Sequence, residues 1–205
     1  MTSDPTSWSA LKTSLANWLN RADFNTAEIP EAIALAERRF QRTLFTPDRE
    51  AEATLTASAE AVSLPADFWG AKAAYVDGDP KSVLEQMTLA ELRNAFPAAA
   101  TGKPRNYAIR GLSMILGPAP DSICSIKLTY LQTIPALGAS QADNWLLTAH
   151  PDAYLHGALF ELFSLTMDET RAAYHEGKLN LIIDESTGPG AAAPTARPRS
   201  ASALP

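Results

Sequence analysis

The chain has 205 residues, of which 46% are hydrophobic and 20% charged, and its formal net charge is −6. This length predicts one well-packed core and is short for two domains. The acidic balance lacks the basic footprint of a dedicated nucleic-acid binder. No stretch approaches the ~20 apolar residues of a membrane helix, and the amino-terminal region has no apolar leader. We therefore expect a soluble protein that is made in the cytoplasm and stays or assembles there.

Two amphipathic helices are predicted at the start of the chain. Asp4 and Pro5 are typical of a helix start, and the first helix is expected over residues 5–21. In the second, expected over residues 30–45, apolar residues recur every three or four positions and charged residues occupy the opposite face. Because only a short connector joins them, the two helices should form an antiparallel hairpin.

Residues 51–134 are expected to form a small antiparallel β-domain inserted between helices. The clearest strand is 124–131, where apolar and polar residues alternate as a half-buried strand requires. We expect it to follow strands at 107–110 and 112–116 in a meander. Cys124 is the only cysteine, so no disulfide can form within the chain. It falls on the apolar side of this strand, which predicts a thiol buried in the core.

Two local signals precede this meander. Asp77-Gly78 favours a tight turn, so residues 71–76 and 81–86 are expected to pair as a hairpin. Thr88 and Glu91 have the spacing of a capping box, in which each side chain binds the other residue's backbone N–H. A short helix is therefore predicted directly after Thr88.

The carboxy-terminal part divides into helix and tail. Residues 145–147 can form one helical turn, and helices are expected over 151–183, with Asp168 capping the last one. Residues 188–205 are rich in proline, alanine, serine and glycine, and such a segment cannot bury enough apolar surface to fold alone.

These patterns together predict an α+β fold that is mainly helical. Residues 1–187 are expected to form a helical bundle with the inserted small antiparallel β-domain, and residues 188–205 an extended carboxy-terminal arm.

The sequence contains none of the common nucleotide-binding, redox or nucleophile motifs. Asp152 and His156 are four residues apart on a predicted helix, with His150 just before it, and such groups can ligate a metal. A third ligand is not evident, so helix capping and surface polarity explain them better. His175 has only its neighbour Glu176 as a nearby carboxylate. We accordingly expect no catalytic or metal-binding residues, no cofactor and no enzymatic activity.

Three arginines on the second predicted helix, Arg38, Arg39 and Arg42, allow two interpretations. They can form a solvated face, with Glu37 nearby. Alternatively they can contact the carboxylates of a partner or a passing phosphate backbone, because like charges four residues apart are unfavourable unless an anion serves them.

The ordered set of short motifs resembles the head–tail adaptor (connector) proteins of tailed bacteriophages and related gene transfer agents. The motifs that carry this resemblance are Ala36-Glu37 with Arg42 and Leu44, Leu64-Pro65-Ala66-Asp67-Phe68, residues 101–107 and 115–120, Leu128-Thr129-Tyr130, residues 134–137, Asn144-Trp145-Leu146, and residues 154–159.

The resemblance implies a ring subunit that is not an enzyme. In this family the subunit is usually present in about twelve copies, docks under the portal protein, extends the DNA channel and presents a surface to tail or stopper proteins. The expected location is the head–tail junction of a virion assembled in the host cytoplasm. DNA would pass without sequence-specific binding, and no membrane contact is expected.

Many such adaptors grip the portal with a carboxy-terminal extension, which here corresponds to residues 186–205. Arg38, Arg39 and Arg42 are the expected interface or channel charges. The portal- or partner-binding residues are expected within the tail, at Pro194, Arg197, Pro198, Arg199 and Leu204. The alternatives are a small metal-dependent hydrolase using Asp152 and His156, and a DNA-binding accessory factor using the three arginines.

Overall fold

A computed structural model of the chain describes residues 5–19, 28–78, 81–97 and 100–186. These residues form two compact units instead of the single core that the chain length predicts. The helical unit comprises the described residues up to Asp48 together with those from Ile134 onward, and the β unit comprises residues 49–133. Each unit has its own apolar core, because the inserted segment is long enough to close two sheets on each other.

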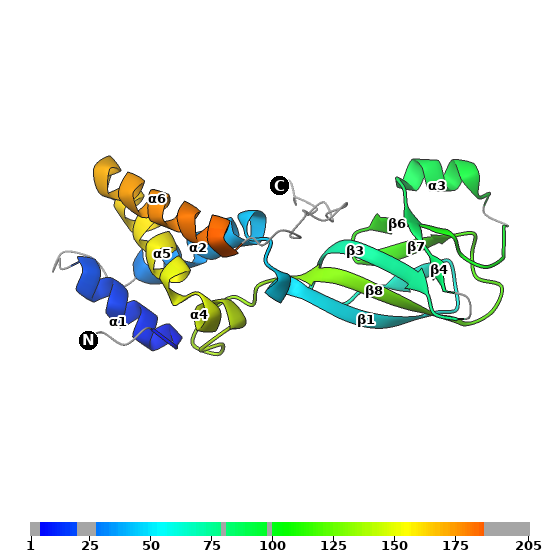
Figure 1. Ribbon diagram of the computed structural model, residues 1–205, viewed down its shortest axis with the longest axis horizontal. Coiled ribbons are helices and arrows are strands. Elements are labelled where there is room, and N and C mark those ends of the chain that lie inside the picture. Colours follow the sequence, from blue (N-terminus) through cyan, green and yellow to red (C-terminus); the bar gives the residue numbers. More distant parts are fainter. Residues whose placement is uncertain (1–4, 20–27, 79–80, 98–99, 187–205) are drawn as a thin grey trace, which may run out of the picture. The chain divides into compact units, whose positions relative to one another are not determined.

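The helical unit is organised around its longest apolar helix, α5, which contacts α1, α2, α4 and α6 (Figure 1). The first two helices begin at Trp8 and Glu28, whereas the sequence suggested Pro5 and Pro30. The bounds of the helices in this unit are α1 Trp8–Leu19, α2 Glu28–Thr43, α4 Trp145–Ala149, α5 Pro151–Leu165 and α6 Glu169–Ser186.

Two polar side chains cap helix starts, and the sequence indicated one of them, Asp168. Asn144 accepts a hydrogen bond from the backbone N–H of Leu147 (2.8 Å) and so caps α4. Asp168 accepts from the backbone N–H of Arg171 (3.2 Å) at the start of α6. These caps satisfy donors that the first turn of a helix leaves without partners.

A close approach between α2 and α5 depends on Gly157. A Cβ atom at this position would lie 2.7 Å from Cζ of Phe40 and 3.3 Å from Cβ of Ala36. Phe40 in turn meets Tyr154 edge-to-face, with ring centroids 5.2 Å apart. The absence of a side chain at Gly157 therefore lets the ring of Phe40 pack directly against the backbone of α5.

The β unit contains two four-stranded sheets, in the strand orders β1-β8-β3-β4 and β2-β7-β6-β5 (Figure 1). A short 3₁₀ turn, Pro47–Arg49, precedes the first strand. The elements of the unit are β1 Glu50–Ala57, β2 Ala61–Ser63, β3 Phe68–Val76, β4 Ser82–Val83, β5 Glu85–Gln86, α3 Leu89–Ala95, β6 Asn106–Arg110, β7 Ser113–Gly117 and β8 Cys124–Gln132.

The predicted meander is wrong in its last step. β6 and β7 pair as an antiparallel hairpin, but β8 leaves them and pairs on both sides in the other sheet, with β1 and with β3. The hairpin predicted from Asp77-Gly78 forms only between β3 and β4, since β5 pairs in parallel with β6. Alternation identifies a half-buried strand but does not say which strand lies beside it.

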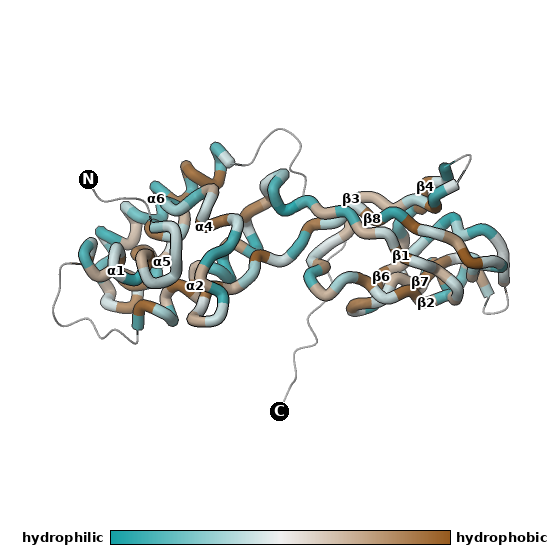
Figure 2. Tube along the Cα trace, turned by 90° about the horizontal axis from the view of Figure 1, so that it is seen from below, coloured by the Kyte–Doolittle hydropathy of each residue, from teal (hydrophilic) through white to brown (hydrophobic). Residues whose placement is uncertain are grey.

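The alternating pattern of β8 is confirmed by its burial. Ile126, Leu128 and Tyr130 lie in the core that both sheets enclose. Cys124, expected as a core thiol, is only half-buried at the start of this strand. Figure 2 shows the corresponding changes between hydrophobic and hydrophilic residues along the strands. The core of the β unit follows directly from this period of two.

The capping box at the start of α3 is confirmed. Thr88 accepts from the backbone N–H of Glu91 (3.3 Å), and the Glu91 carboxylate accepts from the backbone N–H of Thr88 (2.9 Å). The hydrogen bonds with Thr88 lower the pKa of Glu91. α3 then packs on the second sheet through Leu92 and Phe96 beside Gly117, where a Cβ would lie 2.6 Å from each side chain.

Candidate interaction surface of the helical unit

The three arginines of α2 do not act as one group. Arg39 is half-buried and binds two carboxylates, with its Nη1 3.0 Å from Glu176 of α6 and its Nε 3.6 Å from Glu161 of α5. Its guanidinium also lies 4.2 Å from the ring centroid of Phe160. Arg39 therefore joins three helices of its own unit, a role that the sequence did not indicate.

Arg38 and Arg42 fit the interaction hypothesis better. Both side chains are exposed, and neither forms an ion pair with a residue that the structure describes. They lie four residues apart on one face of α2, so two positive charges sit together with no described carboxylate to neutralise them.

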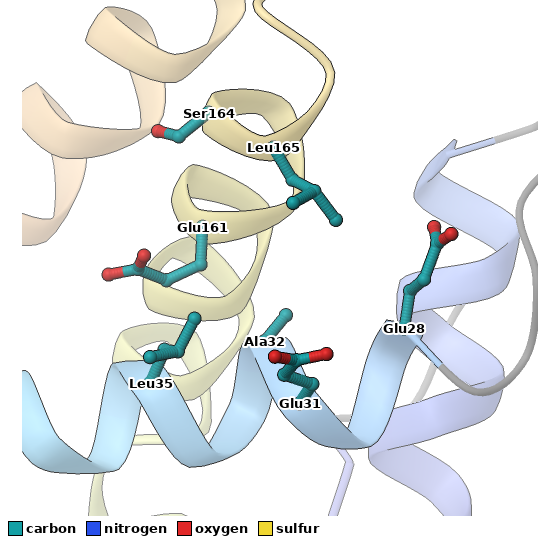
Figure 3. Close-up of a pocket in the computed structure, with 7 residues that line it drawn as sticks. All are labelled: Glu28, Glu31, Ala32, Leu35, Glu161, Ser164 and Leu165. Atoms are coloured by element: carbon teal, nitrogen blue, oxygen red, sulfur yellow. The ribbon is translucent and has the colours of Figure 1, made fainter.

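An acidic hollow of about 150 Å³ lies between α2 and α5 (Figure 3). Its apolar wall includes Leu35, which is 39% exposed, and Leu165, which is 63% exposed. Three carboxylates surround this wall: Glu28 and Glu31 on α2, and Glu161 on α5, which already binds Arg39. The hollow thus combines apolar surface with negative charge, a combination suited to an arginine or lysine with its apolar stem.

The buried carboxylate of Glu37 holds the segment that leads into α4. The sequence pattern did not indicate this role. Glu37 accepts hydrogen bonds from the backbone N–H of Leu137 (2.7 Å) and from the hydroxyl of Tyr154 (3.1 Å). Asn144 donates to the same hydroxyl (2.7 Å) and to the carbonyl of Pro135 (2.7 Å). These contacts join α2, α5 and residues 134–144.

The ionisation of this cluster reflects its burial. Desolvation raises the pKa of Glu37, and the hydrogen bonds from Leu137 and Tyr154 oppose that rise. Burial, together with the nearby charge of Glu37, raises the pKa of Tyr154 so that its hydroxyl stays a donor. Glu37 and Tyr154 therefore stabilise the packing of the helical unit. In the sequence, the sign of such a role is a polar residue on an otherwise apolar helix face.

The histidines considered as ligands form a contact with each other. Nδ1 of His156 on α5 lies 2.9 Å from Nδ1 of His175 on α6, so one ring donates and the other accepts. The ring of Phe163 stacks on His175 at 5.5 Å, and Trp18 meets both histidines edge-on. Burial, and secondarily the neighbouring His156, lowers the pKa of His175 to about 4.

Asp152 and Glu176, the carboxylates considered beside these histidines, make other contacts. Asp152 accepts from the backbone N–H of Ala153 at the start of α5 (3.0 Å), and Glu176, the predicted neighbour of His175, binds Arg39 instead. Within the described ranges, no three histidine, cysteine, aspartate or glutamate side chains gather closely enough to hold a metal ion.

The tail residues Pro194, Arg197, Pro198, Arg199 and Leu204 lie outside the residues that the structure describes. Their assignment to partner binding remains a prediction. In the described part of the chain, no helix has the length and apolar character needed to cross a membrane.

The described features define an α+β protein with a helical unit, whose surface combines charged and apolar side chains, and a β unit with its own core. The sequence model of the SU10 adaptor protein family matches residues 6–201, so the chain belongs to this family of phage head–tail adaptors. A comparison with curated proteins gives no match. Family membership implies a structural phage adaptor located in the virion, with portal and tail proteins as its partners.

Proposed function

We propose that the protein is a structural, non-enzymatic subunit of the head–tail junction of a tailed phage or gene transfer agent. About twelve copies form a ring beneath the portal, extend the DNA channel and dock a tail or stopper protein. The subunits assemble in the host cytoplasm and remain in the virion. The family match over residues 6–201 is the observation that carries this proposal.

The charge of the chain supports a role beside passing DNA. The formal net charge is −6, and phosphates repel an acidic channel wall, so the DNA can move without being trapped. A closed ring also requires two different patches on each subunit that meet around the circle.

The tail supports docking on the portal. Arg197 and Arg199 are the only charged residues of 188–205, and prolines and alanines surround them. A segment of this composition cannot bury enough apolar surface to fold alone, so a partner surface is the place where it would be held.

Mixing the purified protein with its portal tests both parts of the proposal. We expect the full chain to co-elute with the portal on size exclusion and to form a ring on it in electron micrographs. A chain ending at residue 187 and the Arg197→Ala/Arg199→Ala variant should lose this binding. Ser200→Ala/Ser202→Ala serves as the matched control and should bind normally.

The outcomes separate the tail assignment from the function. Unchanged binding by the truncated chain would overturn the portal-binding role of the tail while leaving the adaptor proposal standing. Absence of binding by the full chain at micromolar concentrations of both proteins would contradict the adaptor proposal itself.

A further inference from the structure

One face of α2 carries five residues spaced by alternating steps of three and four. We name this set, Glu28, Glu31, Leu35, Arg38 and Arg42, the α2 stripe. This is the spacing of a coiled-coil seam, so the five side chains line one side of the helix. Glu28 is half-buried and the other four are exposed.

The charges of the α2 stripe are arranged about its centre with near symmetry, the inner pair being offset by one residue. Two glutamates precede Leu35 by seven and four residues, and two arginines follow it by three and seven. When one copy of the helix is reversed against another, Glu28 meets Arg42, Glu31 meets Arg38, and Leu35 meets its own counterpart. The stripe is thus complementary to a second copy of itself.

We propose that two copies of the free protein pair through their α2 stripes, antiparallel and about a two-fold axis. This contact goes beyond the ring proposed above and does not depend on it. Glu28 and Glu31 of the stripe also line the hollow between α2 and α5, so the arginines of the second copy would lie at its edge. Its exposed leucines, Leu35 and Leu165, supply an apolar centre for the contact.

Because positive and negative residues lie on the same face of α2, the contact should form a two-fold dimer and not a ring. A ring places its two complementary patches on different sides of the subunit, so that each copy contacts two neighbours. When both complementary patches lie on the same face, one partner contacts both of them. The assembly then stops at a dimer. The contact therefore belongs to the protein before it enters a ring.

The dipole of the helix explains only part of this arrangement. Acidic residues near the start and basic residues near the end of a helix are favourable in any protein. That effect does not account for the exposed leucine at the midpoint. Nor does it explain why Glu28, Glu31, Arg38 and Arg42 share one face while none of them forms an ion pair with a described residue.

A single helix pair buries less surface than a stable dimer requires, so the pair should be weak, with a dissociation constant in the micromolar range or above. Its charges are exposed and subject to screening. Raising the salt from about 0.05 M to about 0.5 M should weaken it by roughly tenfold or more.

Charge reversal with sedimentation velocity tests the contact. Glu28→Arg/Glu31→Arg gives an all-basic stripe and Arg38→Glu/Arg42→Glu an all-acidic one. We expect the wild type to form dimers at low salt, each variant alone to stay monomeric, and an equimolar mixture to recover dimers. Circular dichroism of each variant verifies that it is folded.

Cysteine crosslinking tests the two-fold geometry. In a Cys124→Ser background, Leu35→Cys should form a disulfide-linked dimer under mild oxidation, because the two copies of residue 35 face each other. Ala34→Cys, an exposed neighbour on the same helix, is the matched control and should crosslink at least fivefold more slowly.

Three results would overturn the proposal. These are a wild type that stays monomeric at low salt up to millimolar concentration, a mixture of the two charge variants that does not recover dimers, and equal crosslinking at residues 34 and 35. Portal binding is measured separately, so any of these results leaves the adaptor proposal to its own test.

Discussion

The two units of the chain reach their folds through different kinds of contact. In the β unit, backbone pairing joins the strands and an apolar core lies between the two sheets. In the helical unit, polar side chains join segments that are far apart in the sequence: Glu37 reaches Tyr154 across 117 positions and Arg39 reaches Glu176 across 137. Helices satisfy their own backbone groups, so side chains must specify which helices lie together.

This difference predicts that the two units respond differently to substitution. The β unit should be most sensitive to lost apolar volume, and the helical unit to lost polar partners as well. Hydrogen exchange measured by mass spectrometry reports on peptides from each unit separately, and is therefore a suitable readout for both.

The largest effect is expected from Leu128→Ala in the central strand β8. Leu128 is fully buried and pairs with β1 on one side and β3 on the other. Removing it should lower the unfolding free energy of the β unit by about 3 kcal/mol, from lost transfer energy and a remaining cavity. Lys127→Ala, the half-buried neighbour on the same strand, is the control and should cost much less. Similar losses for both would contradict the view that buried volume dominates in this unit.

A comparable loss, about 2–3 kcal/mol, is expected from Glu37→Ala in the helical unit. This change leaves the N–H of Leu137 and the hydroxyl of Tyr154 without their shared acceptor in a buried site. Glu37→Gln keeps an acceptor oxygen and should cost less than half as much. Chemical denaturation of the two variants at neutral pH gives the comparison, and equal stability of Glu37→Ala and wild type would refute it.

Glu37 also predicts a pH dependence with a definite sign. Burial raises its pKa, so the folded protein binds a proton more tightly than the unfolded chain does. This contribution to stability is greatest below the ordinary carboxyl pKa and is lost as the pH rises through the raised pKa. The free energy of unfolding of wild type minus that of Glu37→Gln should therefore fall with rising pH across this window. A difference that rises instead would contradict the burial of this carboxyl group.

Gly157→Ala should cost about 2 kcal/mol, because the added methyl group would have to displace the buried ring of Phe40. Gly177 of α6 is the matched control, since a Cβ there meets nothing within 4 Å. Gly177→Ala should stabilise the helical unit by about 0.5–1 kcal/mol. Thermal unfolding of both variants tests the pair, and a loss at residue 177 equal to that at 157 would show that helix packing is not the cause.

The smallest effect is expected from the arginines of α2. Arg39→Ala should cost about 1 kcal/mol, since Arg39 binds two partly exposed carboxylates and packs on Phe160. Arg38→Ala should change stability by less than about 0.5 kcal/mol. Denaturation at low and high salt distinguishes them: the cost at Arg39 should shrink with salt. Equal effects at both positions would mean that the contacts of Arg39 contribute nothing.

Local patterns in the sequence predicted local structure well. The two-residue period of β8 identified a half-buried strand, and Thr88 with Glu91 identified the start of α3, because both signals lie within a few residues. The family resemblance was also correct, because it rested on the order of several short motifs along the chain.

Contacts between distant segments could not be predicted in the same way. The alternation of β8 is the same whether it lies beside β7 or between β1 and β3, so the meander was wrong. His156 and His175 lie on two helices, and only the packing of α5 against α6 brings their rings together. The arginines looked alike in the sequence, and only the placement of Glu161 and Glu176 separates Arg39 from Arg38.

The adaptor function is tested most directly by cryo-electron microscopy of the full chain mixed with its portal. We expect a closed ring of this protein beneath the portal, with a central channel wide enough for duplex DNA. Portal particles that carry no added ring, under conditions where the protein is folded and in excess, would contradict it.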